Sequence, residues 1–347
     1  MYWFNANQRK AFSLKRAIIS SAIFLLLIIS CAEQDSSNLR ESEHSSMAYL
    51  NVKDMVDYAP EMVAPGIIST GNFEGHATVT PDGGEIYYAI YSNDHRYSTI
   101  AYSLKNGNTW SKPKIAAFSG KYSDGSPALS PDGKTLFFSS NRPVVGDSAK
   151  NDIDIWYVER TSSGWEKPIH LGANINTEFR EFSPSVDLNG NLYFCSNRPG
   201  GLGDMDVYKS AFVNGNYMPA EILGDSINSK YREGNVGVSP DGSMLFIMVQ
   251  HKPGDYGYDD IHYSFKKGNE WLKAKNIGEI INTNTYDFAP KVSPDGEYLY
   301  FSSRINRDFN LAGQKPYTYE EFQNYLNSPL NGFGNIYRIK INELGLK

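Results

Sequence analysis

Short hydrophobic runs recur along this chain, and each follows the same polar turn. The two clearest copies read SPDG-KTLFFSS from Ser130 and SPDG-EYLYFSS from Ser293, and three weaker turns close on Gly83, Gly190 and Gly242. Within the turn, Pro presets φ, Asp bonds back to the backbone and Gly takes a left-handed conformation. The flanking aromatic and β-branched residues therefore predict two antiparallel strands joined by the turn.

The spacing of these turns predicts a repeat fold. The closing glycines Gly83, Gly133, Gly190, Gly242 and Gly296 lie 50, 57, 52 and 54 residues apart. A period near 50 in an all-strand pattern indicates a propeller, in which each unit buries its faces against its neighbours. Four strands fit each repeat; in the second they are SPALS, TLFFSS, DIDIWYVER and KPIHLG.

The last repeat lacks its fourth strand, because the chain ends soon after GNIYRIKIN. A segment resembling that strand lies at the other end, from Tyr58 to Ile67. Pairing it with the last repeat would close the ring and remove its exposed edges. We therefore predict an all-β fold over residues 58–347: a five-bladed β-propeller of four-stranded antiparallel blades, closed by an N-terminal strand.

Residues 1–30 have the pattern of an export signal. Four basic residues precede an apolar run from Ala17 to Ser30 that is too short to span a bilayer comfortably. The run ends in Ile28-Ile29-Ser30-Cys31, which resembles the lipobox of bacterial lipoproteins, although Ile28 stands where Leu is usual. That resemblance implies cleavage before Cys31 and a lipid on its thiol; a plain signal peptide with a chance cysteine is the alternative.

A polar segment follows, and residues 31–57 are predicted to be a flexible tether. Glu33 and Asp35 resemble the acidic surface-export signal of Bacteroidetes lipoproteins. The expected location is the outer membrane, on the cell surface or on the periplasmic face. Cys195, inside the strand NLYFCSN, is predicted to be an inert buried thiol.

Charge excludes one class of partner. Losing residues 1–30 removes four basic groups and no acidic one, which takes the formal net charge from −6 to −10. Nucleic acid phosphates would repel so acidic a protein. The membrane is expected to be contacted through the lipid anchor only.

The repeats resemble a known family. The pattern Ser-Pro-Asp-Gly, then Tyr-Phe-Ser-Ser-Asn-Arg-Pro, then Asp-Ile-Tyr is similar to the WD-like propeller repeats of the periplasmic TolB protein, over residues 58–343. Such repeats also occur in lipoproteins and in outer-membrane proteins that bind peptidoglycan. The resemblance implies a propeller and an envelope location, and it says little about function, because sites are grafted onto folds.

An acid begins the innermost strand of every repeat, and we expect the five to ring one mouth of the central channel. Three arginines end the second strand at the same mouth. The residues are Glu74, Asp124, Glu181, Glu233 and Asp287, with Arg142, Arg198 and Arg304. They form either a binding site for a cationic group, a sugar or a divalent ion, or an acid–arginine lattice that holds the blades. Repetition favours the lattice, since a catalytic residue is needed once.

Metal sites have weaker support. Three Asp pairs open the third strands, and oxygen-rich clusters can hold Ca²⁺; they are Asp152 and Asp154, Asp204 and Asp206, and Asp259 and Asp260. Alternate strand residues point to opposite faces, so these acids are expected to cap backbone instead. No other cofactor is predicted, and no nucleophile elbow or phosphate loop appears.

Features that break the repeat are the better guide to function. Near the acid mouth we expect His76, Arg180, Arg232, His251, Lys291 and the loop of Tyr256 and Tyr258. An insertion of about 30 residues separates Arg304 from Asn335.

Within the insertion, Thr318 and Glu321 have capping-box spacing, and Tyr319, Phe322 and Leu326 share one helical face. We predict a short helix that docks this face on the mouth as a lid.

These patterns predict a lipid-anchored envelope propeller that acts as a binding or scaffold module. Its partner would be an envelope protein or glycan engaged at the acid mouth. The alternative is a glycan-active enzyme, a glycoside hydrolase or lyase, that uses mouth carboxylates. Binding is favoured, because enzymes of that kind use carboxylates with distinct roles, whereas the five acids here look equivalent.

Overall fold

A computed structural model describes residues 60–305 and 316–347. The expected signal peptide, the lipidated Cys31 and the tether lie outside these residues, as do residues 306–315 of the insertion. In the described part of the chain, no helix has both the length and the apolar character needed to cross a membrane.

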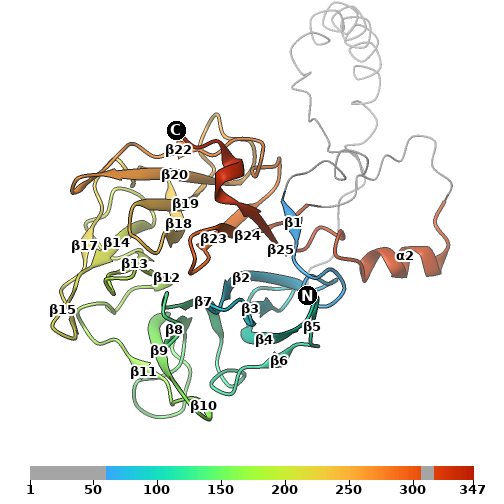
Figure 1. Cartoon of the computed structure of the whole chain (residues 1–347), viewed down its shortest axis with the longest axis horizontal. Helices are drawn as coiled ribbons and strands as arrows, with labels where there is room; N and C mark the ends of the chain where they lie inside the picture. The colour runs from blue at the N-terminus through green and yellow to red at the C-terminus, as the bar shows by residue number, and fades with distance from the viewer. Residues whose placement is uncertain (1–59, 306–315) are drawn as a thin grey trace, which may run out of the picture. The chain divides into compact units, whose positions relative to one another are not determined.

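Five antiparallel sheets surround a central channel, with β2, β7, β12, β18 and β23 innermost (Figure 1). Blade 1 contains β2 (Phe73–Val79), β3 (Glu85–Tyr91), β4 (Ser98–Asn106), β5 (Thr109–Trp110) and β6 (Lys114–Ile115). Blade 2 contains β7 (Asp124–Leu129), β8 (Thr135–Ser140), β9 (Asp154–Thr161), β10 (Gly164–Trp165) and β11 (Ile169–His170). Blade 3 contains β12 (Glu181–Val186), β13 (Leu192–Ser196), β14 (Asp206–Ser210), β15 (Phe212–Val213), β16 (Asn216–Tyr217) and β17 (Glu221–Ile222).

Blade 4 contains β18 (Arg232–Val238), β19 (Met244–Gln250), β20 (Asp259–Lys267), β21 (Glu270–Trp271) and β22 (Lys275–Asn276). Blade 5 contains β23 (Asp287–Val292), β24 (Tyr298–Ser303), β25 (Asn335–Lys340) and β1 (Glu61–Met62), and a 3-10 helix follows over Ile341–Leu344. Each blade is a four-stranded antiparallel path, to which β5, β10, β21 and the β15–β16 hairpin add short extensions. The predicted five-bladed propeller is confirmed.

The N-terminal strand closes the ring. β1 pairs antiparallel with β25, with Glu61 opposite Arg338 and Met62 opposite Tyr337. In Figure 1 the blue β1 lies beside the red β25, so the two ends of the described chain share one blade. The predicted closure is therefore confirmed.

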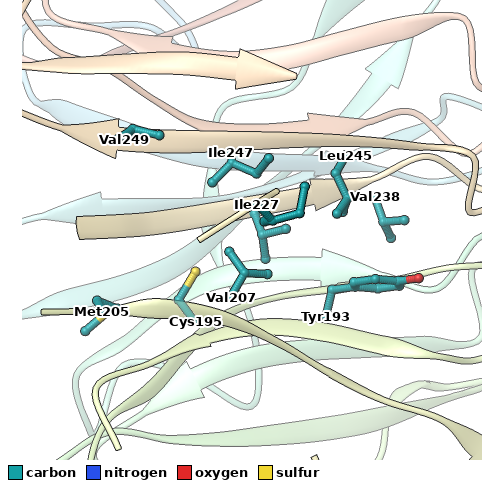
Figure 2. Close-up of a cluster of buried hydrophobic side chains, with 10 residues drawn as sticks. Tyr193, Cys195, Met205, Val207, Ile227, Val238, Leu245, Ile247 and Val249 are labelled. Atoms are coloured by element: carbon teal, nitrogen blue, oxygen red, sulfur yellow. The ribbon is translucent and has the colours of Figure 1, made fainter. Parts of the chain in front are cut away.

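Hydrophobic side chains fill the space between neighbouring blades. Figure 2 shows one such cluster, in which Val207 and Cys195 of blade 3 face Ile247 of blade 4. Cys195 is fully buried there, and burial raises the pKa of its thiol. This placement agrees with the prediction of an inert buried thiol.

Every inner strand carries a β-bulge just after its acid. At the bulges of blades 1, 2, 3 and 5, the residue two places after the acid has positive φ: 56° at His76, 48° at Ser126, 56° at Ser183 and 55° at Ala289. In blade 4 the bulge lies between Glu233 and Asn235. Bulges bend a strand and redirect its side chains, and here they do so around the channel.

The predicted helix of the insertion forms, but it does not dock. α2 spans Tyr319–Leu326, and Thr318 and Glu321 make the expected capping box. None of its residues is buried, and Tyr319 is 81% exposed. The segment after the helix is fixed instead, since Asn331 Nδ2 donates to the Gly71 carbonyl at 2.8 Å. The prediction that the aromatic face packs on the mouth is therefore wrong. The insertion is attached to the propeller by hydrogen bonds of the segment after the helix, and not by packing of the apolar face of α2.

Candidate functional site

The five repeated acids are buried within the blades. Glu74, Asp124, Glu181, Glu233 and Asp287 are at most 1% exposed. Each accepts a hydrogen bond from a Ser or Thr hydroxyl four or five residues earlier: Thr70, Ser119, Thr177, Ser229 and Thr283. Typical distances are 2.7 Å at Glu181 and 2.6 Å at Glu233. These carboxylates therefore hold the connections between blades.

Two of the three repeated arginines complete a lattice with these acids. Arg142 Nη2 lies 2.7 Å from Asp124 Oδ1, and Arg198 Nη2 lies 3.2 Å from Glu181 Oε1. Each arginine also donates to a backbone carbonyl. The lattice interpretation fits blades 2 and 3.

Glu74, Glu233 and Asp287 have no basic partner among the described residues. Burial raises the pKa of Glu74, and it raises the pKa values of Glu233 and Asp287 to about 7. Nearby Asp206 and Asp260 add to the shifts at Glu233 and Asp287. The acid–arginine lattice is thus limited to two blades.

Arg304 is the exception among the arginines. Its guanidinium lies over two aromatic rings, 4.8 Å from the centre of Phe73 and 4.7 Å from that of Tyr286. Its Nη2 is 3.0 Å from His95 Nε2, and no described carboxylate forms an ion pair with it. Arg304 is therefore a cation held in place at the mouth by rings rather than by an acid.

A cavity of about 320 Å³ opens at this mouth. Its lining comes from the starts of the inner strands and from the loops beside them: Phe73, His76, Tyr91, His95, Ser98, Ser123, Gly125, Ser126, Ser139, Ile153, Phe182, Asn235, Asp259, Tyr286, Phe288 and Arg304. None of the five repeated acids belongs to this lining. The cavity, rather than the acid ring, is therefore the candidate site at this mouth.

Aromatic rings make up one wall of the cavity. Phe73 contacts His95, Tyr91 and Phe288, with ring centres 4.7, 5.1 and 5.8 Å apart. Tyr286 continues the wall and stacks on Tyr258 at 5.0 Å. These lining rings come from blades 1 and 5, with Tyr258 of blade 4 behind Tyr286, and they present a surface for apolar or planar groups.

A neutral histidine forms part of the cavity floor. Asn235 Oδ1 accepts from the Ala289 amide, so its Nδ2 donates to His76 Nε2 at 3.3 Å. The His76 proton then lies on Nδ1, which is 2.9 Å from the Tyr91 hydroxyl. Burial, with nearby Lys291, lowers the pKa of His76 to about 3. With both nitrogens engaged, His76 positions the floor and is not free to act as a base.

Asp259 is the one carboxylate in the lining contributed by the described residues. Gln250 donates to its Oδ1 at 2.9 Å, and burial raises its pKa. Its partner in the sequence, Asp260, turns away and accepts from the Tyr256 and Gly257 amides. Asp206 caps the Leu202 amide in the same manner. Backbone capping is thus found for one member of each of these two pairs, since Asp204 pairs with Arg232 instead. For the third pair the prediction is wrong, because Asp152 and Asp154 contact the side chains of Lys150 and His170.

The described residues contain no group of three or more His, Cys, Asp or Glu side chains arranged to hold a metal ion. Ca²⁺, the weaker alternative for the Asp pairs, therefore has no cluster to support it in residues 60–305 and 316–347.

Two further predicted residues lie outside the cavity. His251 is exposed and contacts Tyr258 edge-on at 5.6 Å. Lys291 is buried and donates to the carbonyls of Pro184 and Val236 at 2.6 and 2.7 Å. It lines a narrow gap beside the turn residues Pro131 and Pro294, so its expected place at the acid mouth is wrong. Its strand position, four residues beyond the acid, carries it toward the other end of the channel.

Sequence reasoning missed most of the cavity wall. Aromatic residues flank the acids of blades 1, 3 and 5, where the other repeats have Ser, Arg or Gly; they are Phe73, Phe182, Tyr286 and Phe288. That departure from the repeat was a usable signal. The contributions of His95, Tyr91 and Asp259 depend on how loops meet in space, which the repeat does not specify.

Comparison with known proteins adds little to this geometry. No family model matches the chain, and no curated protein matches it. Among solved structures, a putative TolB from Agrobacterium tumefaciens is 20% identical, with 69% of this chain and 76% of that chain covered and a TM-score of 0.42.

Two arabinofuranosidase structures are also similar. The catalytic domain of the Coprinopsis cinerea GH62 α-L-arabinofuranosidase is 12% identical over 82% of this chain and 98% of that chain, with a TM-score of 0.48. The α-L-arabinofuranosidase from Lactobacillus brevis is 12% identical over 79% and 92%, with a TM-score of 0.45. The five-bladed fold rests on the strand pairing of this chain, and the comparisons carry no conclusion about its activity.

Proposed function

We propose that this chain is a lipid-anchored envelope binding module that engages a protein or glycan at one mouth of its propeller. The observation that carries the proposal is the cavity at that mouth, where Arg304 lies over two aromatic rings and no described carboxylate is within ion-pair distance. Asp259 of the same lining is near enough to interact with the charge of Arg304. A well-formed cavity with aromatic walls and a few polar groups is the usual form of a ligand site.

The glycan-active enzyme is the less supported alternative. Most glycoside hydrolases place two carboxyl groups on either side of the scissile bond, whereas the described lining supplies only Asp259. A lyase needs a free base, and the His76 nitrogens are both hydrogen-bonded. Binding needs neither arrangement.

The location is part of the proposal. Export by residues 1–30 and lipidation at Cys31 would place the propeller on the outer membrane, at the cell surface or on the periplasmic face. The acidic charge of the exported chain is in keeping with a partner other than nucleic acid.

Binding assays with two cavity variants test the proposal. Purified protein would be titrated with peptidoglycan fragments, envelope polysaccharides and envelope proteins. We expect Tyr286→Ala and Arg304→Gln to weaken binding about tenfold or more, since each removes a cavity contact. Arg232→Gln is the matched control, because Arg232 lies at the same mouth but pairs with Asp204 outside the cavity.

The same samples separate binding from catalysis. Glycan cleavage that disappears in Asp259→Asn, with an unchanged thermal melt, would establish the enzyme instead. Binding by Tyr286→Ala and Arg304→Gln that equals binding by the unmodified protein would place the site elsewhere on the molecule.

A further inference from the structure

The polar atoms of the cavity floor are already paired with one another. The Ser98 and Ser123 hydroxyls are 3.2 Å apart, and Ser139 Oγ accepts from the Ser183 amide at 3.2 Å. His76 is bonded on both nitrogens, to Tyr91 and to Asn235. A ligand entering the floor therefore finds apolar surface and few free polar atoms.

A pyranose or furanose ring fits this floor poorly. Sugar rings carry hydroxyl groups around their edge, and each buried hydroxyl without a partner costs about 1–3 kcal/mol. Stacking on Phe73 or Phe288 would not satisfy those groups. An apolar side chain, in contrast, needs no hydrogen-bond partner in the floor, and its burial against the rings is favourable.

Arg304 adds one strong polar requirement. Its guanidinium is held between Phe73 and Tyr286, and only Nη2 donates to a described side chain, His95. A planar guanidinium fixed in this way is suited to a planar carboxylate, which it binds through two parallel hydrogen bonds. Because the rings fix the arginine in advance, little entropy is lost when the anion arrives.

We infer that the cavity takes the C-terminal residue of a partner polypeptide, with its α-carboxylate on Arg304 and an aromatic or aliphatic side chain on the floor. Asp259, with one oxygen held by Gln250, offers its other oxygen to a peptide N–H. Capture of a chain end by fixed donors is an established mode of peptide recognition. This inference rests on the proposed function and names the partner class of the same site.

Short fluorescein-labelled Gly-Ser peptides ending in Phe, Leu or Ser, each as free acid and as carboxamide, test the inference by anisotropy with the purified full chain. We expect the Phe and Leu acids to bind, and their amides to bind at least about tenfold more weakly, since a hydrogen bond to a charged group is lost. The Ser acid should also be weaker. Arg304→Gln should bind acid and amide alike, whereas Arg232→Gln should keep the preference for the acid.

Three other outcomes would overturn the inference, and they show whether the proposed function fails with it. Equal binding of acid and amide by the unmodified protein would exclude carboxylate capture. Binding of oligogalacturonate through Arg304, with no binding of the peptides, would make the ligand an acidic glycan and leave the proposed function intact. Peptide and oligogalacturonate binding that is unchanged in both Arg304→Gln and Tyr286→Ala would contradict the mouth as the site, and with it both proposals.

Discussion

Carboxylates at equivalent positions of this repeat are stabilised in different ways. Asp124 and Glu181 each face an arginine, whereas Glu233 and Asp287 rely on hydroxyl and amide donors alone. Burial without a cation disfavours the charged form, and the pKa values of Glu233 and Asp287 rise to about 7. The same repeat position therefore stabilises the fold in blade 2 and opposes it in blade 4 once the acid ionises.

This difference predicts opposite effects of neutral substitutions. A carboxyl whose pKa is raised in the folded state holds its proton longer than in the unfolded chain. Stability therefore falls as pH rises from about 4.5 to about 7, by roughly 3 kcal/mol at most for Glu233. Glu233→Gln should remove this loss. The melting temperature of the variant, relative to that of the unmodified protein, should therefore rise between pH 5 and pH 8.

Asp124→Asn, in contrast, should destabilise the fold. It leaves Arg142 buried without its anionic partner, which costs about 3–5 kcal/mol. Thermal melts of both variants across that pH range check the pair. A pH-independent difference between Glu233→Gln and the unmodified protein would contradict the raised pKa.

The repeat located the acids but not their surroundings. Hydroxyl partners such as Thr177 and Ser229 occupy one spacing in most repeats and were available to sequence reasoning. The bulges were not, because Ser126, Ser183 and Ala289 are residue types that rarely adopt a positive φ. Those bulges turn His76 and Ser126 toward the cavity, so the site could be placed at the correct mouth but not assembled.

At the scale of elements, a strand of only two residues closes the ring. β1 contributes two paired residues, yet the segment after it buries Val63 and Ile68 against blades 5 and 1. Those side chains, more than the two backbone pairs, join the ends of the ring. The exposed ion pair of Glu61 with Arg338 adds little.

Truncation and a point variant test this closure. Deleting residues 58–68 should expose the edge of β25 and destabilise or aggregate the propeller, whereas deleting residues 32–48 should not. Ile68→Ala should cost about 2–5 kcal/mol, because the side chain is fully buried. Ile115→Ala, on a half-exposed edge strand, is the matched control. Equal melting temperatures for the two deletions would refute closure by β1.

The helix of the insertion was predicted from its cap and its ends, and those local signals were sufficient. Docking was predicted from its aromatic face, and that failed because tertiary contacts decide where a face packs. Phe322 and Leu326 are each about two-fifths exposed. A function of the insertion in partner binding remains a prediction.

Substitutions on this face should accordingly be silent in stability. Phe322→Ser is expected to change the free energy of unfolding by no more than about 0.5 kcal/mol, as for an ordinary surface site. Denaturant titration measures it, with Phe138→Ser in the buried core of blade 2 as the contrast. A loss of several kcal/mol in Phe322→Ser would show that the face is packed in solution.

At the scale of the whole molecule, the channel is not equivalent at its two ends. One mouth holds the aromatic cavity, and toward the turn end Lys291 crosses to the carbonyls of Pro184 and Val236. Burial lowers the pKa of this lysine to about 7. The two ends of the channel therefore differ in chemistry, with aromatic rings at one and a buried, hydrogen-bonded lysine toward the other.

The predicted anchor determines whether that mouth acts at a membrane. Residues 1–30 are basic and then apolar, and the apolar run ends at Cys31, where a lipid would be attached. One acyl chain alone holds a protein only reversibly, so stable anchoring requires the additional chains that lipoprotein processing supplies.

Cys31→Ser removes the attachment atom and should leave the protein uncleaved or in the aqueous phase of a detergent phase separation. The unmodified chain should enter the detergent phase, and so should Cys195→Ser, because Cys195 is buried between blades 3 and 4 and far along the chain from the signal. Detergent-phase partitioning of the Cys31→Ser protein after signal cleavage would show that something other than this thiol carries the propeller to the membrane.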